Sequence, residues 1–109
     1  MEVPKLAIDK ESTNRYYIYL FYVAGKWWAF GHSAYYLHIM YPELEVAATA
    51  SPGHDACMPY VHLTDSFLLR LSAFYSTLVG DEYIQVETPP AVSCFRNNYD
   101  GWQEKLSVN

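Results

Sequence analysis

The sequence predicts an α/β fold of the α+β type, in which helices pack on a mixed β-sheet. Runs rich in aromatic and β-branched residues alternate with stretches of helical periodicity, and glycine and proline residues separate them. Apolar residues make up 51% of the chain and charged residues 17%, which is typical of an ordered globular protein. Because 109 residues suffice for one hydrophobic core, we expect a single domain over 1–109.

The first third of the chain predicts a β-hairpin. Residues up to Asn14 are polar and mixed, and within them residues 5–8 are predicted to form a short edge strand. The run RYYIYLFYVAG is bulky and β-branched without clean alternation, which favours a central strand covered on both faces. Gly25 and Lys26 are then predicted to form the hairpin turn, and WWAF the returning strand.

Two helices are predicted in the middle of the chain, with a strand between them. Ser33 is a suitable N-cap for the helix AYYLHIMY, which Pro42 ends. ELEVAATA predicts a third strand and SPGHD a surface turn. Thr64 is expected to cap the second helix, and Gly80 to end it. Apolar residues at helical spacing predict that this helix faces the core: Phe67, Leu68, Leu71, Phe74, Tyr75 and Leu78.

The last third predicts one more strand and a docked tail. EYIQVET alternates apolar and polar residues, which is typical of a strand with one buried face, and Pro89 and Pro90 end it. The tail, 91–109, carries aromatic residues around the turn sequence NNYDG. We therefore expect a turn and a short segment that packs on the domain.

Charge and apolar patterning exclude several classes of function. Twelve acidic residues against seven basic ones give a net charge of -5, which disfavours a general DNA-coating role. The longest apolar run, 16–24, is too short to span a bilayer, and nothing near Met1 has the pattern of a signal peptide. We expect a soluble, cytoplasmic protein without a membrane partner, in which Cys57 and Cys94 are reduced thiols.

Metal-binding and catalytic interpretations find little support. His54, Cys57 and His62 form the spacing H-x2-C-x4-H across the loop that is expected before the second helix, with Asp55 among them, but structural zinc normally requires a closed set of four ligands. A Cys-His nucleophilic pair lacks an orienting third group in the sequence. We expect a non-catalytic protein without a metal or cofactor, and zinc at these residues stays open as the alternative.

Four stretches, taken in order, carry a resemblance to a known family. FYVAG, AFGHSA, MPY followed by DSFLLRL, and QVETP resemble the corresponding segments of the N-terminal mismatch-recognition domain of the MutS family of DNA repair ATPases. The likeness covers residues 15–90, followed by the docked tail. It corresponds to the first module of such a protein, and the chain has no Gly-x4-Gly-Lys-Ser/Thr loop for ATP.

The resemblance implies that the DNA contact lies just after the hairpin turn. The family has aromatic-aromatic-Glu there: the first aromatic side chain wedges against an unpaired base from the minor groove, and the Glu hydrogen-bonds that base. This chain is one residue shorter in the segment, so two registers fit. The first register places Trp27 at the wedge position and Ala29 at the Glu position. The second places Lys26 at the wedge position and Trp28 at the Glu position. Neither register supplies a carboxylate.

Two functions therefore remain open. As a DNA-binding module, the chain would contact unpaired or mismatched bases through Trp27 or Trp28, with Lys26 and Arg15 meeting phosphates on one edge. Adjacent strand residues point to opposite faces, so one tryptophan is expected to be packed and the other half-exposed. As an alternative, the aromatic-rich surface or a sheet edge would serve a protein partner or a homodimer, and mismatch recognition would be lost.

Overall fold

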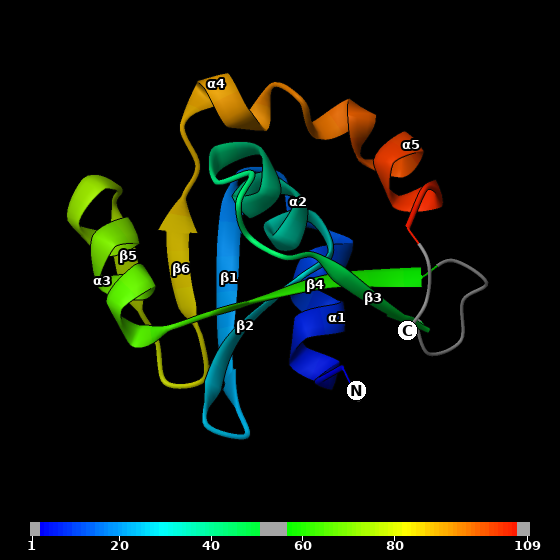
Figure 1. Ribbon diagram of the computed structural model, residues 1–109. Helices are drawn as coiled ribbons and strands as arrows, with labels where there is room; N and C mark the ends of the chain where they lie inside the picture. The colour runs from blue at the N-terminus through cyan, green and yellow to red at the C-terminus, as the bar shows by residue number, and fades with distance from the viewer. Residues whose placement is uncertain (1–2, 51–56, 107–109) are drawn as a thin grey trace.

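The α+β class is confirmed in the computed structural model, which describes residues 3–50 and 57–106 (Figure 1). The strands are β1 (Tyr17–Val23), β2 (Lys26–Phe30), β3 (Ala47–Ala50), β4 (Cys57–Leu63), β5 (Thr77–Val79) and β6 (Ile84–Glu87). The helices are α1 (Lys5–Ser12), α2 (Gly31–Met40), α3 (Asp65–Phe74), α4 (Pro90–Ser93) and α5 (Tyr99–Glu104), with a 3-10 turn, η1, at Arg96–Asn98. The sheet has the order β3-β4-β2-β1-β6-β5. Its described strand pairs are all antiparallel, whereas a mixed sheet was expected.

The β1–β2 hairpin is confirmed, with its turn one residue earlier than predicted. Ala24 and Gly25 have φ of 52° and 80°, and Val23 pairs with Lys26 across the turn. Two central residues with positive φ form the turn type whose twist matches that of the flanking strands. Gly25 adopts this conformation without the steric penalty that a side chain would add.

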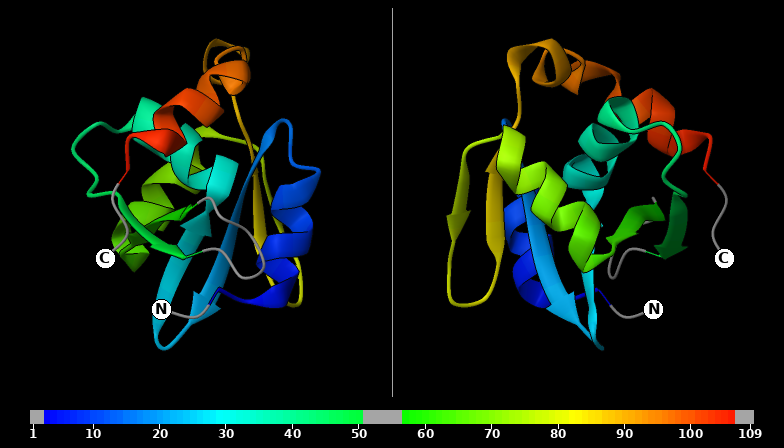
Figure 2. Two further views of the ribbon diagram at one scale, coloured as in Figure 1. Left: turned by 90° about the vertical axis from the view of Figure 1, so that its right-hand side faces the viewer. Right: turned by 60° about the vertical axis from the view of Figure 1, so that its left-hand side comes forward.

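Helices cover both faces of the sheet (Figure 2). One face, here called the α1 face, packs against α1, and the other, the α2 face, lies under α2, α3 and the tail. Because side chains alternate along a strand, neighbouring residues of β2 enter different cores. Ala29 belongs to the α2-face core and Phe30 to the α1-face core, and both are fully buried.

The tail docks on α2, as predicted. Tyr99 of α5 is buried, and its ring stacks on His32 with 3.9 Å between ring centroids. Trp102 lies 4.9 Å from the Tyr35 ring, again between centroids. The Tyr35 hydroxyl donates to the Phe95 carbonyl at 3.2 Å. Aromatic contacts therefore hold the tail over the outer side of α2 (Figure 1).

Two regular elements differ from the prediction. Residues 5–8 belong to helix α1 rather than to an edge strand, because Ala7 and Glu11, four residues apart, are both buried on one side of it. Residues 57–63 form strand β4 in place of a loop. The alternation of this strand is regular, since Pro59, Val61 and Leu63 are buried on the α2 face.

Helix boundaries were predicted with mixed success. Thr64 does cap α3, since its hydroxyl oxygen accepts the Phe67 N–H at 3.2 Å. Helix α2 ends at Met40, shortly before Pro42. However, α2 begins at Gly31, so Ser33 lies inside the helix and is not its N-cap. Gly80 is not a helix cap either, because it lies in the turn between β5 and β6.

The second helix is shorter and far more exposed than its periodicity predicts. It ends at Phe74, and Leu78 belongs to strand β5. Phe74 is 78% exposed and Leu78 63%, while Leu71 is buried. The core-facing prediction therefore holds for only part of that set. The predicted strand at 43–50 begins later, at Ala47, and the predicted turn SPGHD lies entirely outside the described residues.

Within residues 3–50 and 57–106, no helix combines the length and the apolar character needed to cross a membrane.

Candidate functional site

The four predicted contact residues lie in three different places in the structure. Lys26 and Trp28 lie on the α1 face of β2, and Trp27 lies on the α2 face. Arg15 precedes β1, at the end of that strand opposite the hairpin turn. At ~3.3 Å per residue, Arg15 and Val23 are roughly 25 Å apart. Arg15 and Lys26 therefore do not share an edge, contrary to the expectation from sequence.

A cavity of about 350 Å³ opens in front of Trp28. It is lined by Lys26, Trp28, Glu45, Ala47, Tyr60 and His62. The Trp28 ring is 5.6 Å from the Tyr60 ring and 5.4 Å from the His62 ring, between centroids, with interplanar angles of 63° and 59°. The Lys26 ammonium lies 5.9 Å from the Trp28 ring centroid. The cavity thus combines three aromatic side chains, one cation and one carboxylate.

Strand register builds this cavity. Trp28 is paired with His62, and Phe30 with Tyr60, across the β2–β4 ladder. Cross-strand partners share a face, so Tyr60 and His62 of β4 are brought beside Trp28. Ala47 of β3 pairs with Tyr60 in turn, and Glu45 stands two residues before it. The small Ala47 side chain leaves room between the aromatic rings and Glu45.

The Trp28 ring is held in one orientation. Its indole N–H donates to the Val23 carbonyl at 2.9 Å, across the hairpin. The ring is half-buried and packs against the α1-face core, which includes Phe21 and Phe30. Since the N–H is occupied, the indole offers its π-surface to a ligand. Lys26, Glu45 and His62 are exposed, so polar groups surround that surface.

The two registers of the family resemblance fall on different faces of β2. Trp27 packs against the α2-face core and lies 5.0 Å from the Tyr22 ring, and Ala29 is 0% exposed. A ligand cannot reach the Ala29 side chain. In the second register, Lys26 and Trp28 both line the cavity. The tryptophans do occupy opposite faces, as predicted, but both are half-buried and both pack on a core.

Tyr60 and Glu45 were not anticipated as site residues. The alternation in MPYVHL would have indicated that Tyr60 and His62 share a face, had this stretch been read as a strand. Glu45 gives no comparable signal, because it lies in an irregular segment before β3. Its position beside Trp28 depends on sheet order alone.

The described residues provide no metal site. Cys57 and His62 are five positions apart on β4 and therefore point to opposite faces. The Cys57 thiol contacts the Gln103 carbonyl at 3.5 Å, on the α2 face. His54 and Asp55 lie outside the described residues. Within those ranges, no three His, Cys, Asp or Glu side chains are placed to hold a metal ion, and Cys57 and Cys94 are free.

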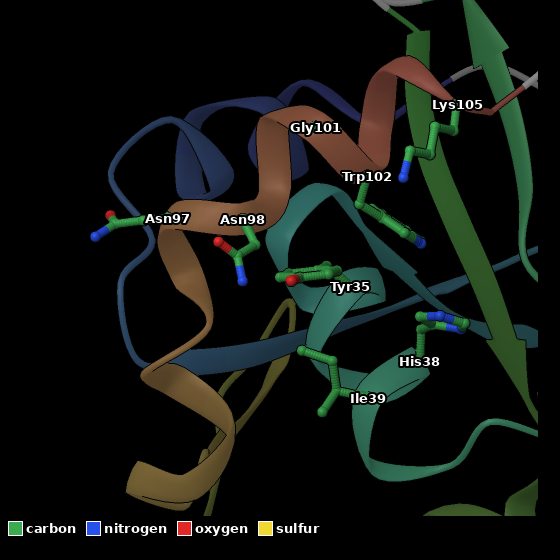
Figure 3. Close-up of a pocket in the computed structure, with 8 residues that line it drawn as sticks. All are labelled: Tyr35, His38, Ile39, Asn97, Asn98, Gly101, Trp102 and Lys105. Atoms are coloured by element: carbon green, nitrogen blue, oxygen red, sulfur yellow. The ribbon is translucent and has the colours of Figure 1, made fainter.

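A second cavity, of about 570 Å³, lies between α2 and the tail (Figure 3). Its lining comprises Tyr35, His38, Ile39, Asn97, Asn98, Gly101, Trp102 and Lys105. The His38 ring stacks on Trp102 at 5.4 Å and 26°, and its Nδ1 is buried without a hydrogen-bond partner. No function was predicted for these residues from the sequence, and the aromatic contacts serve first to dock the tail.

A buried carboxylate, Glu11, supports α2 rather than either cavity. It accepts the Ser33 N–H at 3.2 Å and the Ser33 hydroxyl at 2.5 Å, and the Asn14 amide lies 3.2 Å from its Oε1. Burial raises the pKa of Glu11 from 4.5 to about 7, against the opposing effect of these hydrogen bonds. Ser33 thus serves as a buried partner of Glu11, and its hydroxyl also accepts the Tyr19 N–H at 2.8 Å.

Comparison of the chain with protein-family models, with curated proteins and with solved structures finds no match.

Proposed function

We propose that the chain is a MutS N-terminal-domain-like module that binds an unpaired or mismatched base in the Trp28 cavity. The observation that carries this proposal is the Trp28 π-surface, fixed by its hydrogen bond to Val23 and flanked by Lys26 and Glu45. Stacking of a base on an aromatic side chain contributes about 1–3 kcal/mol in single-strand binders. In the register that places Lys26 at the family's wedge position and Trp28 at its Glu position, both residues line this cavity, and Trp28 takes over the stacking role from the wedge residue.

Glu45 supplies the acceptor that the hairpin lacks. In the MutS family, a Glu two residues after the wedge residue hydrogen-bonds the base. Neither register of this chain places a carboxylate at that position. Here a carboxylate reaches the same cavity from the segment before β3. A carboxylate accepts hydrogen bonds from exocyclic amino groups such as that of cytosine. Lys26 meets the phosphate next to a stacked base.

The charge of the chain limits this binding to a local contact. With a net charge of -5 and one lysine at the cavity, few phosphates are neutralised. Binding is therefore weak, selects accessible bases over paired ones, and weakens further as salt is added. No catalytic step is involved.

The test is a tryptophan-fluorescence titration at low salt with three DNAs: a matched duplex, the same duplex with one unpaired base, and a single strand. We expect quenching that favours the accessible base and is lost in Trp28→Ala. Trp27→Ala is the matched control and should keep it, because Trp27 lies on the other face. Glu45→Gln should reduce the preference among bases.

Circular dichroism verifies that each variant is folded. Absence of quenching with every DNA, at roughly tens of micromolar where non-specific binders respond, would refute the proposal. Equal loss in both tryptophan variants would show that the Trp28 cavity is not the contact.

A protein-interaction role is the second candidate, and one observation favours it. Apolar side chains of α3 and β5 are open to solvent: Leu69 at 69%, Phe74 at 78%, Leu78 at 63% and Val79 at 73%. Strand β5 also lies at the edge of the sheet. Sedimentation equilibrium distinguishes the two functions, since an apolar interface would give a dimer that persists at high salt while DNA binding is lost.

A further inference from the structure

A third cavity, of about 440 Å³, lies at the end of β1 opposite the hairpin turn. It is lined by Arg15, Tyr16, Pro90, Ser93, Cys94, Arg96 and Asn97. Two hydrogen bonds bring these segments together: the Thr88 N–H and hydroxyl both donate to the Tyr16 carbonyl, at 2.9 and 2.6 Å. The start of β1 and the beginning of the tail thus form the two walls.

The cavity concentrates positive charge in an acidic protein. Arg15, Arg70 and Arg96 are the chain's three arginines, and two of them line this one space. No carboxylate belongs to the lining, and neither arginine forms an ion pair within residues 3–50 and 57–106. The Arg96 Nε is buried and has no hydrogen-bond partner. Two guanidinium groups are therefore left without a counter-ion.

The positive charge of Arg96 lowers the pKa values of neighbouring groups. Burial, and then the Arg96 cation, lower the pKa of His32 to about 4, while Asp100 acts in the opposite direction. His32 is therefore neutral at physiological pH. The Tyr36 hydroxyl, which donates to the Arg15 carbonyl at 2.6 Å, also lies within the field of Arg96. Asp100 is close enough to act on His32 but lines no part of the cavity.

The remaining polar groups of the lining are neutral hydrogen-bond donors. Ser93 and Tyr16 present hydroxyl groups, and Asn97 presents an amide. A guanidinium binds oxyanions through a planar fork of N–H donors. Two such forks with additional neutral donors suit a tetrahedral anion, because it offers oxygens in several directions, whereas a carboxylate offers two oxygens in one plane.

We propose that this cavity binds a phosphate group, held between Arg15 and Arg96. The shared chemistry is a phosphate oxyanion, whether it is a free phosphate or part of a nucleic-acid backbone. The site is separate from the Trp28 cavity and stands whether or not that cavity binds a base. It also gives Arg15 a partner in Arg96, in place of the Lys26 expected from the sequence.

The experiment is an NMR titration of the labelled protein with inorganic phosphate at constant ionic strength, following the Arg Nε–H resonances. We expect a saturable shift of the Arg96 resonance. Arg15→Gln and Arg96→Gln should each weaken phosphate binding at least tenfold. Arg70→Gln is the matched control and should leave it unchanged, because Arg70 lies on α3, away from the cavity.

A second titration identifies the source of the phosphate, using a short single-stranded oligonucleotide without terminal phosphates. If its binding also weakens in Arg15→Gln and Arg96→Gln but not in Arg70→Gln, the site holds a backbone phosphodiester. If only inorganic phosphate responds to these variants, the site holds a free or terminal phosphate. Either result supports the site. A non-saturable response, or one that is equal in all three arginine variants, would overturn it.

Discussion

Helices α2 and α3 have the same length but differ in how far they are buried. Both contain ten residues and both are rich in apolar side chains. Six residues of α2 are buried, whereas α3 buries Leu71 alone and leaves Leu69 and Phe74 open to solvent. Nevertheless α3 has the clearer apolar periodicity in the sequence. Periodicity therefore predicted the helix correctly and its burial poorly.

The difference lies in what covers each helix. One side of α2 packs on β1, β2 and β4, and the tail closes its outer side (Figure 1). A helix between two layers is buried on opposite sides, which explains the weak apolar periodicity of its sequence. Helix α3 packs by one stripe on the α2-face core, through Phe67, Leu68 and Leu71, and no described element covers its outer side.

The two helices also begin differently. Helix α3 is capped from its own sequence by Thr64. Helix α2 follows β2 without a side-chain N-cap, and Glu11 of α1 accepts its N-terminal N–H groups instead. A Cβ at Gly31, whose φ is 57°, would lie 3.2 Å from the Glu11 side chain, so Glu11 and α2 are in close contact. The stability of α2 thus depends on a distant segment.

The largest expected effect sets one leucine of each helix against the other. Leu37→Ala, in α2, should lower the free energy of unfolding by about 2–5 kcal/mol, because Leu37 is 0% exposed and its loss opens a cavity. Leu69→Ala, in α3, should change it by less than about 0.5 kcal/mol, since Leu69 is 69% exposed. Urea denaturation measures both, and equal losses would contradict the comparison.

The next expected effect is the pH dependence of stability that arises from Glu11, which hydrogen-bonds the start of α2. The pKa of Glu11 is raised to about 7 in the folded protein, so its contribution to stability is full below 4.5 and is lost as pH rises through 7. The loss amounts to about 3 kcal/mol. The pKa of His32 is lowered to about 4, so its contribution is present above 6.5 and is lost as pH falls.

These two trends oppose each other in the parent protein between about 4.5 and 6.5. Glu11→Gln should unmask the His32 trend, with stability rising over this range. His32→Phe, which keeps a ring on Tyr99, should unmask the Glu11 trend, with stability falling. Urea denaturation at four pH values tests this, and profiles that run parallel to the parent in both variants would refute the assignment.

Removing the cap of α3 should have a smaller effect than Leu37→Ala or the loss of the Glu11 contribution. Thr64→Ala should cost about 1 kcal/mol, because the Phe67 N–H loses its side-chain acceptor at an exposed helix end. Thr64→Ser is the control and should retain most of the stability. A loss as large as that of Leu37→Ala would show that α3 is more tightly integrated than its exposure indicates.

Short-range chemistry made much of the fold predictable. The hairpin, the end of α2 before Pro42, the Thr64 cap and strand β6 each depend on residues within a few positions of one another. The two sides of β2 were also foreseen, because strand alternation is local. Strand β4 was predicted as a loop because the segment resembles the Pro-Tyr-His loop of the MutS family, although Pro59 is buried within the sheet.

The candidate site was predictable only in part, for the same reason. Trp28 and Lys26 were expected as contact residues from the family resemblance just after the hairpin turn, but Tyr60, His62 and Glu45 join them through the pairing of β2, β4 and β3. Likewise Arg15 and Arg96 are far apart in the chain and meet because Thr88 is hydrogen-bonded to Tyr16. The spacing of residues along the chain does not predict that such distant side chains line the same cavity.

From its order of residues alone, the chain specifies where many of its strands and helices form, since turns, caps and alternation act over a few bonds. Which helix is buried, which face of β2 stays open and which charges lie together depend on the order of strands in the sheet and on the docking of the tail. Those arrangements follow from burying apolar surface between distant segments, a free energy that belongs to the assembled layers rather than to any one stretch.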